Sequence, residues 1–63
     1  MTQKELLYVE DAISHEDIII NNIHDYINCL EDNDLIDFYQ KNLRTHEKIR
    51  KELFKLLEDE SYE

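Results

Sequence analysis

The stretch Glu31-Asp32-Asn33-Asp34 is the one break in an otherwise continuous helical pattern, and it decides the fold. Short polar side chains compete with the backbone for hydrogen bonds, so such a cluster favours a turn. The apolar stripe also changes phase here, which favours two antiparallel helices over the alternative, a single helix in a long coiled coil. We expect Asn33 to take the left-handed conformation of a helix end and Asp34 to cap the second helix.

Before the turn, apolar residues recur at alternating steps of three and four, the spacing of one helix face. Thr2-Gln3-Lys4-Glu5 has the pattern of a capping box, which predicts a helix over about residues 3–30. The stripe consists of Leu6, Val9, Ile13, Glu16, Ile20, Ile23, Ile27 and Leu30. With Tyr8, Ala12, Ile19 and Tyr26 on one flank, the apolar arc spans roughly 160°, more than one partner helix would cover.

After the turn, a second helix is predicted over about residues 35–58, with a frayed acidic end from Glu58 onward. Its inward residues are expected to be Leu35, Tyr39, Leu43, His46, Ile49, Leu53, Leu56 and Leu57, with Ile36, Phe38 and Phe54 on the shoulders. The predicted fold is therefore all-α, a single helical-hairpin domain over residues 1–63. Because each hairpin would leave an apolar face uncovered, we expect two copies to form a four-helix bundle.

Composition limits the function classes. The 63 residues include no Gly, no Pro and one Cys, so an internal disulfide is excluded and long helices with little loop are favoured. So short a chain buries only about 60% of its unfolded surface, which again favours a homodimer. The net charge of −9 disfavours nucleic acid as a partner, including for an RNA-binding hairpin dimer, which needs a basic face. Without a long apolar run or a signal-peptide core, we expect a cytoplasmic protein with no membrane span.

Two polar residues lie at the centres of the apolar stripes. Glu16 is about fifteen residues before the turn and His46 about thirteen after it, so a hairpin should bring them face to face. Arg50 is one turn beyond His46, and Asn42 one turn before it. We interpret Glu16, Asn42, His46 and Arg50 as a buried polar layer that fixes the register of the bundle. The alternative is a divalent-metal site that uses Glu16 and His46 from two subunits.

One resemblance rests on these residues. Glu10-Asp11-Ala12-Ile13-Ser14-His15-Glu16, followed by Asp34-x-x-Asp37-Phe38 and by His46 with Leu53, Leu56 and Leu57 behind it, resembles the bacterial spore coat protein F (Coat F) family. The likeness runs from about Lys4 to Leu57. It implies a small ferritin-like helical domain of spore-forming Firmicutes, located in the spore coat among other proteins and without enzymatic activity.

The wider ferritin-like group, as that resemblance implies, takes a Glu from one helix and a Glu-x-x-His from its neighbour. Glu16 matches the first position and His46 the last, but Leu43 stands where the second carboxylate is expected. This difference argues against oxidase or iron-storage chemistry.

The remaining candidates are interpreted as incidental. His15 and His24 point to the flanks of the first helix, and no His or Asp is spaced to activate Cys29 as a nucleophile. The sequence therefore predicts a non-enzymatic structural or protein-interaction module without a cofactor, working as a homodimer. The alternative function is metal binding through Glu16 and His46.

Overall fold

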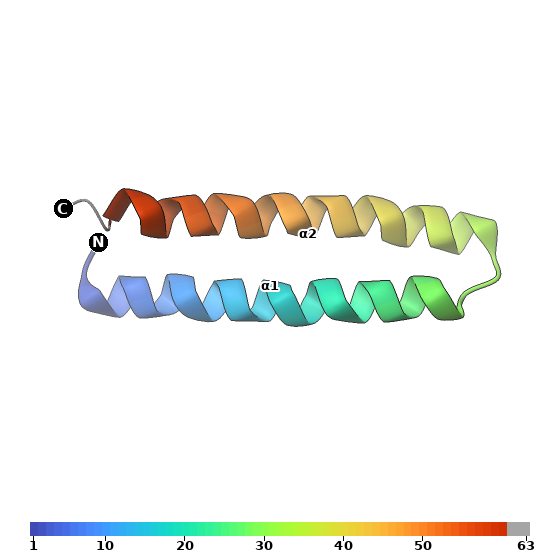
Figure 1. Ribbon diagram of the computed structural model, residues 1–63, viewed down its shortest axis with the longest axis horizontal. Coiled ribbons are helices and arrows are strands. Elements are labelled where there is room, and N and C mark those ends of the chain that lie inside the picture. The colour runs from blue at the N-terminus through green and yellow to red at the C-terminus, as the bar shows by residue number, and fades with distance from the viewer. Residues whose placement is uncertain (61–63) are drawn as a thin grey trace.

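The computed structural model describes residues 1–60, with only the backbone of Glu60, and shows two helices packed side by side in opposite directions (Figure 1). Helix α1 spans Gln3–Cys29 and helix α2 spans Asn33–Glu60. The molecule is an elongated rod measuring 48 × 14 × 11 Å. The predicted all-helical hairpin is confirmed. Neither helix carries, within the described residues, an apolar stretch long enough to cross a bilayer.

The first turn of α1 is held by the predicted capping box. The Thr2 hydroxyl accepts a hydrogen bond from the Glu5 amide at 3.1 Å, and the Thr2 amide donates to the Glu5 carboxylate at 2.7 Å. These bonds satisfy two amide groups that the start of a helix would otherwise leave unpaired. The pKa of the Glu5 carboxyl is lowered. The largest cause is the hydrogen bond from the Thr2 backbone amide, and hydrogen bonding with the Thr2 side chain is the second.

The turn differs from the prediction by two residues. Asp32, not Asp34, caps α2, because its Oδ1 accepts hydrogen bonds from the amides of Asp34 at 2.9 Å and Leu35 at 3.1 Å. Asn33 is already the first helical residue, and the expected left-handed conformation is wrong, since no described residue has a positive φ. Instead, α1 ends because Leu30 becomes extended, with φ −92° and ψ 145°.

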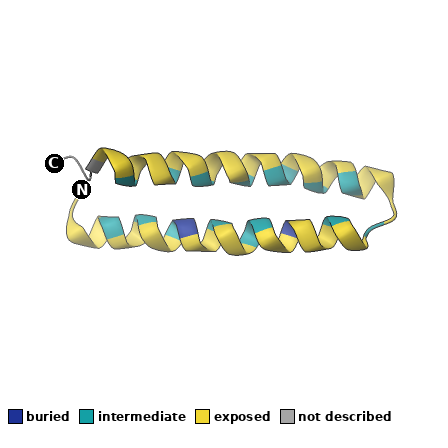
Figure 2. Cartoon of the chain, viewed as in Figure 1, coloured by how far each residue is buried: buried dark blue, intermediate teal, exposed yellow. Residues whose placement is uncertain are grey.

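The interior lies in a narrow strip between the helices, where Ile13 and Ile23 are buried and their neighbours are half-buried (Figure 2). Leu35, Ile49 and Leu56 were expected to point inward, but their exposed fractions are 45%, 37% and 47%. A single neighbouring helix covers only part of the apolar arc of α2, and the remaining part faces outward. The C-terminal limit also differs, since α2 continues to Glu60, two residues beyond the predicted end. Residues 61–63 of the predicted frayed end lie outside the described residues.

Candidate functional site

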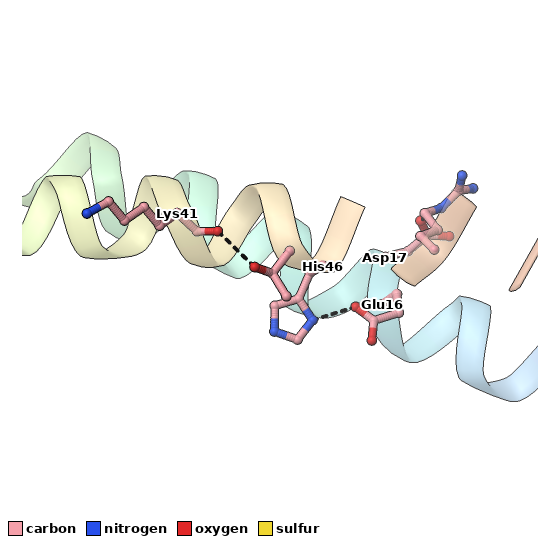
Figure 3. Close-up of polar contacts among 6 residues, drawn as sticks. Glu16, Asp17, Lys41 and His46 are labelled. Atoms are coloured by element: carbon pink, nitrogen blue, oxygen red, sulfur yellow. Dashed lines mark hydrogen bonds and ion pairs between the residues drawn. The ribbon is translucent and has the colours of Figure 1, made fainter. Parts of the chain in front are cut away.

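Glu16 and His46 meet at the middle of the hairpin. Glu16 is the central residue of α1, and His46 lies at the centre of α2. His46 Nδ1 is 2.6 Å from Glu16 Oε2, with side-chain exposed fractions of 24% for His46 and 12% for Glu16 (Figure 3). This contact follows from the nearly equal number of residues that separate each of them from the turn. The expected meeting of the two side chains is therefore present.

The two ring nitrogens of His46 have different surroundings. Nδ1 makes the hydrogen bond with Glu16 Oε2. The second ring nitrogen, Nε2, points away from Glu16 (Figure 3). Of the two ring nitrogens of His46, Nδ1 thus contacts Glu16, and Nε2 is directed away from it.

Arg50 does not join this pair. Its Nε lies 2.5 Å from Oδ1 of Asp17, and the two side chains are 39% and 50% exposed. The long Arg50 side chain thus pairs with Asp17 on α1 instead of with Glu16. Asn42 is half-buried one turn before His46. Of the predicted polar layer, the structure joins Glu16 with His46 directly, and no polar residue among those described is fully buried in the single hairpin.

The contact also bears on metal binding. Two atoms that bind one zinc ion at about 2.0–2.2 Å in tetrahedral geometry lie more than about 3 Å apart. The 2.6 Å separation of Nδ1 and Oε2 therefore leaves no room for an ion between these two atoms. Across the described residues, no group of three or more His, Cys, Asp or Glu side chains lies close enough to hold a metal ion. A metal site shared by two subunits stays a prediction.

The other sequence candidates lie at the surface. His15 and His24 are exposed on α1, and Cys29 is an exposed free thiol at its C-terminal end. Sequence reasoning missed an aromatic cluster, in which Tyr39 contacts Tyr26 with ring centroids 5.6 Å apart and Phe38 with centroids 5.3 Å apart. Tyr26 and Tyr39 lie nearly the same number of residues from the turn, and this spacing could have predicted their contact.

No family model matches the chain. Comparisons with curated proteins and with solved structures likewise find no significant match. The Coat F resemblance therefore stays a prediction.

Proposed function

We propose that this chain is a non-enzymatic structural or protein-interaction module that works as a homodimeric four-helix bundle. The observation that carries the proposal is the thin interior of the hairpin. Among the described residues, only Ile13 and Ile23 are buried, whereas ten large apolar side chains are exposed. The stability of a small domain comes mainly from buried apolar area, and one hairpin supplies very little of it. A second hairpin would complete the interior.

The accessible surface points the same way. A compact monomer of 7.7 kDa exposes about 4,300 Å² by the usual scaling of area with mass. This chain exposes 5167 Å². The hairpin therefore exposes roughly 800 Å² more than a compact fold of the same mass, and a second copy can cover surface of this kind.

A structural role for the Glu16–His46 pair fits this proposal. The pair links the two helices at mid-length, where a polar contact inside an apolar stripe favours one register over its alternatives. General acid–base or nucleophilic catalysis would need further groups arranged around a reacting atom. Fixing the register requires only the two side chains themselves.

The Coat F resemblance supplies the proposed biological setting. We infer a protein made in the cytoplasm that assembles into a spore coat, with a second copy and other coat proteins as its partners. The exposed apolar side chains suit assembly, because contiguous exposed apolar surface marks interaction sites.

Sedimentation equilibrium over a dilution series, with far-UV circular dichroism of each sample, tests the proposed dimer. We expect twice the 7.7 kDa chain mass at high concentration, and loss of helix in parallel with loss of mass on dilution. A fully helical monomer at low micromolar concentration would overturn the proposal.

Melting in the presence of Zn²⁺, Mn²⁺ or Fe²⁺ separates the metal-binding alternative from the structural role. A melting temperature that rises for the wild type but not for Glu16→Gln would favour metal binding through this pair. An unchanged melting temperature supports the structural role.

A further inference from the structure

The hairpin has two unlike faces. At about 100° per residue, Tyr8, Ile19 and Tyr26 lie on one side of the α1 surface that meets α2, and Asp17 lies on the other side. On α2, Leu35, Phe38, Ile49 and Leu56 lie on one side of the surface that meets α1, and Arg50 lies on the other. The ring contacts from Tyr26 through Tyr39 to Phe38 join the two apolar sides, and the Asp17–Arg50 ion pair joins the two polar sides.

We call the first of these the aromatic face, defined by Tyr8, Ile19, Tyr26, Leu35, Phe38, Ile49 and Leu56. Six of the ten exposed large apolar side chains among the described residues belong to it. Phe38, at 58%, and Tyr8, at 60%, are the most exposed members. Phe54, by contrast, lies toward the opposite face. Its ring lies beneath the Arg50 guanidinium, whose carbon Cζ is 5.6 Å from the centroid of the Phe54 ring.

We propose that a second copy packs on the aromatic face with its turn at the same end as the first, so that each Glu16 meets the partner's His46. This inference rests on the proposed homodimer and adds to it the face and the orientation. It assigns a role to the His46 ring nitrogen that the hairpin itself leaves directed away from Glu16.

The available area fits a second copy. Two separate hairpins, each exposing 5167 Å², together expose about 10,300 Å². A compact protein of twice the mass exposes about 7,200 Å². Pairing would therefore remove roughly 3,000 Å² from water, which lies within the range of obligate homodimers.

The central position of the polar pair decides the orientation. Glu16 is the middle residue of α1, with 27 residues, and His46 lies at the middle of α2, with 28, so two hairpins packed in register place their polar pairs at one level. With the turns at opposite ends, α1 packs on the partner's α1, and Glu16 faces the partner's Glu16. Two carboxylates placed together in a site closed off from water repel each other strongly.

With the turns at the same end, α1 packs on the partner's α2. Each Glu16 then lies between its own His46 and the partner's His46, so that carboxyl and imidazole groups alternate around the layer. The ring of His46 has two nitrogens that can each take part in a hydrogen bond, Nδ1 with its own Glu16 and Nε2 with the partner's Glu16.

The acidic turn opposes this orientation. Five carboxylates lie near the turn, and all are exposed: Asp25, Glu31, Asp32, Asp34 and Asp37. Repulsion between exposed charges falls off over about 8 Å at physiological ionic strength. The central layer would be enclosed by four helices and screened far less, so its arrangement decides the orientation. Added salt should accordingly tighten the dimer.

The single cysteine gives a direct test without any substitution. Cys29 is exposed and lies thirteen residues from Glu16, about 20 Å along the helix axis. Nitroxide labels on Cys29 would lie at least about 40 Å apart if the turns were at opposite ends. With the turns at the same end, the two α1 helices lie diagonally across a bundle with neighbouring axes about 10 Å apart, which places the labels within about 30 Å of each other.

Double electron–electron resonance on fully labelled protein should give a single distance below about 30 Å, and dilution with unlabelled chain should abolish the dipolar signal. Sedimentation of the same sample separates the two claims. A dimer mass with labels about 40 Å apart overturns the orientation and leaves the homodimer standing, whereas a monomer mass overturns both. A dimer that keeps its affinity after Phe38→Ala overturns the choice of face.

Discussion

Phe38→Ala tests which face of the hairpin is covered. Phe38 is 58% exposed in the single hairpin. A Phe side chain carries about 200 Å² of surface, so burying the exposed part at about 25 cal/mol per Å² contributes up to about 3 kcal/mol. Ala retains part of this contact, which leaves a loss of about 2 kcal/mol per copy and about 4 kcal/mol per dimer. Since 1.4 kcal/mol corresponds to about tenfold, the dimer Kd should rise roughly 1,000-fold.

Ile18→Ala is the matched control for this change. Ile18 is 57% exposed, nearly the same as Phe38, but it lies on the side of α1 that points away from both α2 and the aromatic face. Truncation there should change the dimer Kd less than about fivefold, because exposed substitutions usually alter stability by about 0.5 kcal/mol or less, which is about 1 kcal/mol for the two copies of a dimer. Sedimentation velocity over a concentration series measures both constants. Equal effects of the two substitutions would refute the assignment of the aromatic face.

Three further changes have defined outcomes. Replacing Glu16 and His46 together by Leu should leave the melting temperature equal or higher while the spin-label distance splits into two populations; an unchanged single distance would show that the pair does not set the orientation. Asp32→Ala should lower the free energy of unfolding by about 1 kcal/mol in urea titrations and Asp34→Ala by only a few tenths, and the reverse order would contradict the observed cap. At the start of α1, the hydrogen bonds of the capping box lower the pKa of Glu5. The capping box therefore contributes its full stability above the ordinary carboxyl pKa, and this stability is lost as pH falls through the lowered pKa. The protection of first-turn amides, measured as the ratio of intrinsic to observed exchange rates, should then fall on acidification, and Glu5→Gln should remove this pH dependence.

The main features of the fold follow from local rules in the sequence. The capping box needs only Thr2 and Glu5 at the right spacing, and both of its hydrogen bonds are present. The contact between Glu16 and His46 needs only the helical rise and a short turn, since a one-residue error in the turn shifts the meeting point by about 1.5 Å. Both features can therefore be predicted correctly even when the bounds of the turn are wrong by a residue or two.

Other features depend on tertiary contacts that residue spacing alone does not determine. Asp32 and Asp34 are both residues that cap helices well, and α2 uses the earlier of the two. Arg50 has a long, flexible side chain, and it pairs with the more exposed Asp17 and not with Glu16. The apolar arc of α2 is wider than one contact, so the periodicity alone could not say that Leu35 would be left outside.

The dependence of the melting temperature on protein concentration tests the homodimer most directly. For an obligate dimer, a hundredfold increase in concentration stabilises the folded state by about 2.7 kcal/mol. With an unfolding entropy of about 2.1 cal/mol/K per residue over two chains of 63 residues, this corresponds to a rise of about 10 °C. We expect that rise in thermal unfolding followed by circular dichroism. A melting temperature that stays constant over the same range would contradict the proposal that the second copy completes the fold.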